Sequence, residues 1–243
     1  MFWGLDARVS AALNAYVGRS WTLDTFCVLV ASNFLFKGAW VVALYPWAWF
    51  QGDEKDRGPR ALLVSGLLAA VASVPLSRVI GGLLPFRERP IRNPLLHLHL
   101  AAGLAPDTLL HWTSFPSDHA ALFAALATTL LWVSWPVGLL ACCYVLAVID
   151  LPRLYLGIHY PTDILAGTVL GVGVALLAVA PAVRNGLAGP SLRVWERRPG
   201  VFYAGFTLLL YLIGTVFGEV PEILRFTATV LASVWHRLGA AGL

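Results

Sequence analysis

Two histidines, His119 and His159, stand where they could transfer protons or attack phosphorus. Each lies at the start of a long apolar stretch, His119 just inside it and His159 two residues before it. Histidine is the side chain best suited to proton exchange near neutral pH, and it is also a nucleophile. Two of them beside arginines at the ends of apolar stretches predict phosphate chemistry on a lipid.

The spacing around His159 indicates a nucleophile. Pro161 suits the first turn of a helix, so His159 lies just outside that helix and Asp163 lies in its first turn. We expect the Asp163 carboxylate to hold one imidazole nitrogen and leave the other free to attack, as the aspartate of a catalytic triad does. His119 is then the candidate general acid.

Two arginines and a serine are candidate phosphate ligands. Guanidinium groups bind phosphate oxygens through paired donors, and charges within apolar segments are costly unless they are used. Ser117 precedes an apolar stretch as a helix N-cap, which predicts free N–H groups facing an anion. We expect Asp118 to turn toward an arginine or toward the helix N-terminus. The predicted phosphate ligands of this group are Arg78, Arg89 and Ser117.

The composition predicts a membrane protein. Of 243 residues, 58% are hydrophobic and 12% are charged, and the mean hydropathy is +0.74. Soluble domains carry about 25% charged residues. The net charge of +4 is not accompanied by a polar basic surface, which excludes a nucleic-acid-binding protein. Asp6 and Arg8 precede any long apolar run, so no cleaved signal peptide is expected.

Recurring apolar stretches predict an all-α fold, a six-transmembrane-helix bundle forming a single domain over residues 1–243. A bilayer crossing needs about 20 apolar residues. Short interfacial helices are expected near both termini, at 1–20 and 220–239. Residues 85–116 form a long connection, typical of a functional loop, and residues 184–200 a polar loop. The six spans are expected at about 24–50, 61–84, 117–135, 137–152, 161–183 and 201–218.

This layout puts both termini and both histidine segments on one side of the membrane. Loops 51–60 and 184–200, on the other side, hold seven basic residues. The termini side holds nine, of which five lie at the candidate site, leaving four. The positive-inside rule then predicts a site that faces the periplasm or exterior of a bacterial-type inner membrane.

The three segments together resemble the motifs of the type 2 phosphatidic acid phosphatase (PAP2) superfamily of membrane lipid phosphatases. Those motifs run Lys-x6-Arg-Pro, Pro-Ser-Gly-His and Ser-Arg-x5-His-x3-Asp. Three positions depart from them: Gly82 stands at the lysine, Asp118 at the glycine and Pro152 at the serine. The matching residues are Arg89-Pro90, Pro116-Ser117-x-His119 and Arg153-x5-His159-x3-Asp163.

The resemblance implies that His159 forms a phosphohistidine, that Asp163 orients it and that His119 is the acid. It also implies phosphate binding by Arg89, Ser117 and Arg153, with no metal or other cofactor. Arg78 is the basic residue nearest to the missing lysine. His97 and His99 lack acidic or cysteine neighbours, so no metal site is expected there.

The expected substrate is a lipid phosphate in the bilayer, first of all a polyprenyl diphosphate such as undecaprenyl diphosphate. The alternatives are phosphatidic acid, phosphatidylglycerol phosphate, or transfer of the phosphoryl group to an acceptor other than water. A membrane lipid transporter is the alternative from another class, although such proteins tend to show repeated halves, and none is visible here. The sequence predicts no oligomeric state.

Overall fold

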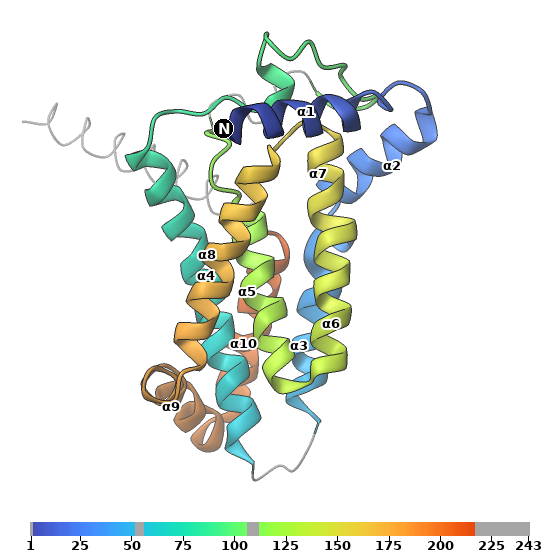
Figure 1. The fold of residues 1–243 in the computed structure, drawn as a ribbon. Coiled ribbons are helices and arrows are strands. Elements are labelled where there is room, and N and C mark those ends of the chain that lie inside the picture. The colour runs from blue at the N-terminus through green and yellow to red at the C-terminus, as the bar shows by residue number, and fades with distance from the viewer. Residues whose placement is uncertain (1, 52–55, 106–111, 217–243) are drawn as a thin grey trace, which may run out of the picture.

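The protein is described by a computed structural model covering residues 2–51, 56–105 and 112–216 (Figure 1). The described residues form helices and loops and no strand, which confirms the all-α prediction. The helices are α1 (Phe2–Asn14), α2 (Trp21–Ser32), α3 (Trp40–Trp49), α4 (Arg57–Leu83), α5 (Asp118–Val133), α6 (Trp135–Tyr144), α7 (Leu151–Tyr155), α8 (Pro161–Val179), α9 (Pro181–Arg197) and α10 (Pro199–Gly214).

By length and composition, three continuous helical stretches of the described chain can cross a membrane: Arg57–Leu83, Trp135–Tyr155 and Pro161–Val179. The second joins α6 to α7 through the π-helical turn Val145–Asp150. Helices α2 and α3, joined by a second π-helical turn, make a fourth candidate that is bent by 62°. Helices α5 and α10 are apolar but have only 16 residues each. The fold is therefore of the helical membrane type, with three or four candidate spans rather than the six expected.

The helices at the two ends of the bundle differ in how well they were predicted. Helix α1 lies across one end, where a short N-terminal helix was expected, and α9 lies at the other end (Figure 1). The prediction of a polar loop over 184–200 was wrong, because α9 runs to Arg197. Pro181 is suited to its first turn. The helix expected at 220–239 lies outside the described residues.

Helix α5 is the centre of the bundle, since it packs against α4, α6 and α8. Two glycines of α8 let it approach α5 closely. A Cβ at Gly167 would overlap the Ser117 carbonyl oxygen, and one at Gly171 would overlap the Ala121 carbonyl oxygen. Small residues allow such close helix contacts in membranes. This contact holds the helix that carries His119 against the helix that follows His159.

The turn between α7 and α8 places His159 beside the segment that carries Arg89. Gly157 has a φ of 66°, a left-handed conformation that favours glycine. The Arg153 carbonyl oxygen accepts a hydrogen bond from the Ile158 N–H at 3.0 Å, and the Gly157 carbonyl oxygen accepts one from the Ile91 N–H at 2.9 Å. The long connection and the turn are thus joined through their backbones.

Candidate active site

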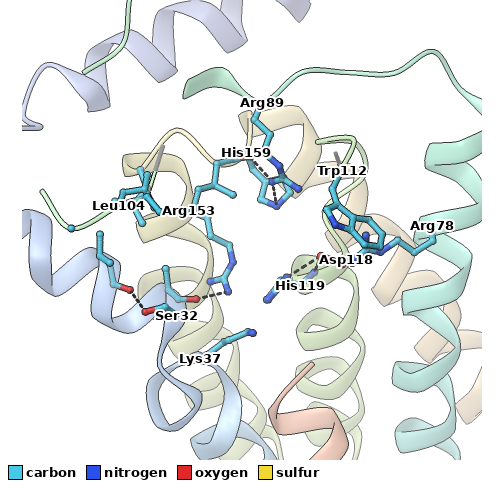
Figure 2. A pocket seen from close by; sticks show the side chains of 16 residues that line it. Ser32, Lys37, Arg78, Arg89, Leu104, Trp112, Asp118, His119, Arg153 and His159 are labelled. Atoms are coloured by element: carbon cyan, nitrogen blue, oxygen red, sulfur yellow. Dashed lines mark hydrogen bonds and ion pairs between the residues drawn. The ribbon is translucent and has the colours of Figure 1, made fainter. Parts of the chain in front are cut away.

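A cavity of about 400 Å³ at the α1 end of the bundle collects most of the predicted site residues. Five of the seven line it, and they come from α4, the long connection, α5, α7 and the turn after α7. Figure 2 shows His159 and Arg89 entering from one side and His119 from the opposite side. The five are Arg78, Arg89, His119, Arg153 and His159.

His159 is held as a buried imidazole with one nitrogen turned to the protein. Its Nδ1 lies 3.0 Å from the Ser114 carbonyl oxygen, which can only accept a hydrogen bond, so Nδ1 carries the proton. Its Nε2 lies 3.4 Å from Nη1 of Arg89, which can only donate. Both neighbours therefore favour the same neutral tautomer, with the Nε2 lone pair on the cavity side.

Burial keeps this imidazole neutral. The residue is 3% exposed, and desolvation lowers the pKa of His159 below its ordinary value. The positive charge of Arg89 lowers the pKa of His159 further, whereas Asp163 acts in the opposite direction. At neutral pH the uncharged form, which has a lone pair to attack with, is the one present.

Asp163 lies on the Nδ1 side of His159, away from the cavity, but it is not the acceptor nearest to Nδ1. Its Oδ2 is 3.6 Å from Nδ1, beyond the distance of a good hydrogen bond. The same oxygen accepts from the Tyr160 N–H at 2.8 Å and from the Ser114 hydroxyl. Asp163 therefore fixes the two backbone segments on either side of the imidazole. The His-x3-Asp spacing predicted a direct hydrogen bond between Asp163 and His159, and the structure places these two groups farther apart than that.

Arg87 and Asp6 extend this network, and the site prediction omitted both. Arg87 donates from Nη1 to Asp163 Oδ1 at 2.5 Å and from Nη2 to Asp6 Oδ2 at 2.5 Å. Asp6 is fully buried and also accepts from the Thr162 N–H at 3.1 Å and the Thr162 hydroxyl at 2.6 Å. Helix α1 is thereby fastened to the carboxylate behind His159. Asp6 carried a weak signal, as an acid within an otherwise apolar N-terminal pattern.

His119 is held on the other side of the cavity by its neighbour in sequence. Its Nδ1 lies 2.9 Å from Asp118 Oδ1, and the His119 N–H donates to the same oxygen at 2.8 Å. Asp118 Oδ2 forms an ion pair with Arg78, whose guanidinium lies 4.0 Å from the centre of the Trp112 ring. Asp118 thus serves both an arginine and the helix N-terminus, the two roles expected of it.

Ser117 does not join the cavity. It is fully buried, and its hydroxyl accepts from the Ala120 N–H at 3.3 Å, which confirms the predicted N-cap. The cap and the Asp118 carboxylate already occupy the N–H groups of Ala120 and His119. The anion site expected from free N–H groups at the start of α5 is therefore filled by the protein's own acceptors.

Arg89 and Arg153 are the buried cations of the cavity. Arg89 donates to the Ile158 carbonyl oxygen at 2.8 Å, and its buried Nε has no hydrogen-bond partner in the described part of the chain. Arg153 donates to the Ile149 carbonyl oxygen at 2.5 Å. Burial, aided by the nearby Arg78 and Arg153, lowers the pKa of Arg89 to about 10, so it stays charged at neutral pH. Lys37, from the bend between α2 and α3, also lines the cavity.

His97 and His99 lie in the long connection, and neither lines this cavity. His99 is used through its backbone, with its N–H donating to Asn14 Oδ1 at 2.6 Å and its carbonyl oxygen accepting from Asn14 Nδ2 at 2.8 Å. These bonds fasten α1 to the connection. Within the described ranges, no three His, Cys, Asp or Glu side chains are grouped as a metal site would need.

Comparisons with known proteins identify the family. The PAP2 superfamily matches residues 86–186, which contain Arg89-Pro90 and the whole of the second and third motif segments. A decaprenylphosphoryl-5-phosphoribose phosphatase of Mycolicibacterium smegmatis is 32% identical over 164 residues, 68% of this chain and 81% of that protein. A bacitracin transport permease protein BcrC of Bacillus licheniformis is 28% identical over 153 residues, 61% of this chain and 68% of that protein.

A third relative aligns with a shorter part of the chain. An undecaprenyl-diphosphatase of Sulfolobus acidocaldarius is 34% identical over 70 residues, 27% of this chain and 32% of that protein. No solved structure matches the chain. With the motif residues inside the family match and a relative aligned over most of its length, the chain belongs to the PAP2 superfamily and is a phosphatase.

Proposed function

We propose that the protein hydrolyses a polyprenyl diphosphate to the monophosphate through a phosphohistidine at His159. One observation carries the mechanism: Nδ1 of His159 faces the Ser114 carbonyl oxygen, and Nε2 faces the cavity beside Arg89. A buried neutral imidazole with a fixed tautomer is an activated nucleophile. The buried arginines are suited to the oxygens that carry charge in the transition state of phosphoryl transfer.

In the first step, Nε2 of His159 attacks the terminal phosphorus and the P–O bond to the leaving group breaks. His119 donates its Nε2 proton to the leaving oxygen, so the lipid monophosphate departs protonated. Asp118, 2.9 Å from Nδ1 of His119, stabilises the imidazolium that must exist before this transfer. Arg89 and Arg153 hold the oxygens of the transferred group.

In the second step, a water molecule attacks the phosphorus of the phosphohistidine. The P–N bond breaks and its electron pair returns to Nε2 of His159. His119, now neutral, accepts a proton from the water and is again the acid for the next cycle. Inorganic phosphate leaves. Each histidine thus ends in the protonation state in which it began.

The charge of the cavity supports a diphosphate as substrate. Among the described residues that line it, four are cationic, Lys37, Arg78, Arg89 and Arg153, and one is acidic, Asp118. A second cavity of about 330 Å³ is lined by Arg78, Arg89, Asp118 and His159 as well, so the headgroup has room on both sides of them. Two relatives, named as a decaprenylphosphoryl-5-phosphoribose phosphatase and an undecaprenyl-diphosphatase, also point to polyprenyl substrates.

Asp6 and Arg87 act as positioning residues in this mechanism. Because Asp163 Oδ1 is bound by Arg87, and Arg87 by Asp6, the docking of α1 sets the position of the carboxylate behind His159. Neither Asp6 nor Arg87 lines the cavity. Their effect on catalysis passes through Asp163 and the backbone around His159.

The mechanism also fits one membrane arrangement. We take residues 1–243 as one domain that crosses the membrane six times. The six crossings are the bent pair α2–α3, α4, α5, α6–α7, α8 and α10. A 16-residue helix is about 24 Å long, near the thickness of a thin bilayer. The catalytic cavity then faces the periplasm or exterior of a bacterial-type inner membrane, as the positive-inside rule favours.

A phosphate-release panel tests the substrate. The purified protein in detergent is given polyprenyl diphosphate, polyprenyl monophosphate, phosphatidic acid and phosphatidylglycerol phosphate. The diphosphate should have the highest kcat/KM. A higher value for phosphatidic acid or phosphatidylglycerol phosphate would replace the polyprenyl proposal, while phosphate transferred to an added lipid alcohol faster than to water would indicate a phosphotransferase.

A further inference from the structure

A second arginine-lined cavity lies at the end of the bundle opposite the catalytic one. It has a volume of about 460 Å³ and lies between the start of α4 and α9. Figure 1 shows α9 and the start of α4 at the end of the bundle away from α1. Arg57 contributes from α4, and Arg184, Asn185 and Arg193 contribute from α9. We call it the α9 cavity.

The positive charge of the α9 cavity is only partly compensated. Nη2 of Arg57 pairs with Oε1 of Glu196 at 2.5 Å, and more than 40% of each of these side chains is exposed. Among the described residues that line the cavity, none is acidic. Glu196 lies outside the lining, and within the described parts of the chain no carboxylate forms an ion pair with Arg184 or Arg193. Such an arrangement attracts an anion.

One donor in the α9 cavity is buried without an acceptor. Nε of Arg184 is buried and has no hydrogen-bond partner among the residues that the structure describes. Leaving a buried donor unpaired is costly, so most such groups in proteins have a partner. No acceptor among the described residues offsets the positive charge of Arg184 at Nε, which adds to the positive charge of the cavity.

The remaining lining favours binding over chemistry. Small residues leave room for a headgroup beside the arginines: Gly58, Ala61, Ala188 and Gly189. The described lining contains no His, Cys, Ser or acidic side chain, so it offers no nucleophile and no general acid of the usual kinds. The α9 cavity is suited to hold a phosphate group without cleaving it.

We propose that the α9 cavity binds the phosphate group of an anionic phospholipid. Helix α9 follows directly on the candidate span α8, at the end of the bundle away from α1 (Figure 1). If α8 crosses the bilayer, α9 lies at the level of the lipid headgroups on that side. Basic cavities between helices at that level bind anionic headgroups. Inorganic phosphate shares this chemistry, and the bilayer makes a lipid headgroup the ligand at hand. The proposal is independent of the catalytic mechanism.

A matched pair of variants of the full-length protein tests the proposal. Arg184→Gln/Arg193→Gln removes two charges from the cavity, whereas Arg197→Gln/Arg198→Gln removes two exposed charges at the end of the same helix, outside the cavity lining. Each protein in detergent is titrated with short-chain phosphatidylglycerol, phosphatidylcholine or inorganic phosphate. Native mass spectrometry counts bound lipids, and tryptophan fluorescence follows Tm.

The cavity variant should bind phosphatidylglycerol about 25-fold more weakly, at about 1 kcal/mol for each arginine, while the control variant should bind as the wild type does. An Arg89→Gln variant should keep this site, which separates it from lipid bound in the catalytic cavity. Equal weakening in both variants, or equal binding of phosphatidylcholine, would overturn the proposal. If millimolar inorganic phosphate displaces no bound lipid, the lipid headgroup is the ligand of the cavity. If inorganic phosphate alone raises Tm as much as phosphatidylglycerol does, the assignment to a lipid is overturned.

Loss of folding in the double variant would be seen as a lower Tm in phosphatidylcholine. In that case Arg193→Gln takes its place, because Arg193 is exposed and tolerates substitution. A single removed arginine should weaken phosphatidylglycerol binding about fivefold, and Arg193→Lys should restore most of it. Unchanged affinity in Arg193→Gln would contradict the proposal.

Discussion

His159 and His119 enter the same cavity from two differently built parts of the protein. His159 is 3% exposed, and the groups around it come from segments far apart in the chain, including α1, the long connection and α8. The side chain of His119 is 20% exposed, and its imidazole is held by the adjacent Asp118. A nucleophile must keep one tautomer and remain neutral, which needs burial and fixed acceptors. An acid that is protonated in each cycle needs a carboxylate and access to water.

The His119 side of the cavity also contains two of the departures from the family motifs. Asp118 replaces the glycine of the second motif, and Arg78 is the basic residue nearest to the missing lysine of the first. In the structure these two residues form an ion pair with each other. The residue at the glycine position and the arginine nearest to the missing lysine therefore contact each other. On the His159 side, Arg153, His159 and Asp163 all stand at the positions of the family motif.

The largest expected effect is on the His159 side. His159→Ala removes the proposed nucleophile, and phosphate release should fall by about 10⁴-fold or more, as for nucleophile deletions in other enzymes. The measurement is initial phosphate release from a lipid phosphate, with Tm as the control for folding and EDTA added to the wild type as a second control. Wild-type activity in His159→Ala would refute the phosphohistidine.

The His119 side should show a smaller effect that depends on the leaving group. His119→Ala removes the proposed acid and should lower kcat by about 10²–10⁴-fold for a lipid substrate. A leaving group of low pKa needs no proton, so a nitrophenyl phosphate should restore most of the rate. An equal loss of rate for both substrates would mean that His119 is not the acid.

Asp6 tests whether the distant support of His159 matters. Asp6→Asn keeps the size of the side chain and removes the charge that Arg87 binds, so Asp163 should shift. A small misplacement of a reacting group costs about 10- to 100-fold in rate, so kcat should fall with KM nearly unchanged. Asp56→Asn, at the N-cap of α4, serves as the control. If Asp6→Asn lowers Tm but leaves kcat unchanged, Asp6 stabilises the fold and does not position the catalytic residues.

The pH profile tests the neutral state of His159. Because burial and Arg89 lower the pKa of His159, kcat/KM should be independent of His159 ionisation at neutral pH. It should fall about tenfold per pH unit only below that pKa, which is itself below the ordinary value of about 6.5. Arg89→Gln removes one of the lowering causes, so the acidic fall should move to higher pH. A shift to lower pH would contradict this assignment.

The smallest effect is expected for the coupled departures. Arg78 has a side chain 45% exposed, so its pair with Asp118 contributes about 1 kcal/mol or less, and Arg78→Ala should raise KM only a few-fold. In an Asp118→Gly background Arg78 is no longer held by the carboxylate, and removing it should raise KM more. Equal effects in the two backgrounds would show that the pair is not coupled to substrate binding.

Local sequence predicted much of this architecture because its signals act over short distances. Ser117 before an apolar run and Pro161 at the start of another mark helix N-termini through backbone geometry alone. Helix α9 was missed because Gly186, Gly189 and Pro190 interrupt a polar segment, a pattern typical of loops. It is helical in the structure, where the Ser65 hydroxyl of α4 donates to the Arg184 carbonyl oxygen at 3.4 Å.

The class of the protein, its apolar segments and the residues of the histidine motifs could be predicted from the sequence alone, since composition and motif spacing are local properties. The acceptor that faces Nδ1 of His159 and the residues that bind Asp163 could not, because they depend on how distant segments pack. The Ser114 carbonyl oxygen is 45 residues away from His159, and Asp6 is 81 residues away from Arg87. Such pairs form only when α1, the long connection and α8 pack together, and no pattern along the chain encodes that contact.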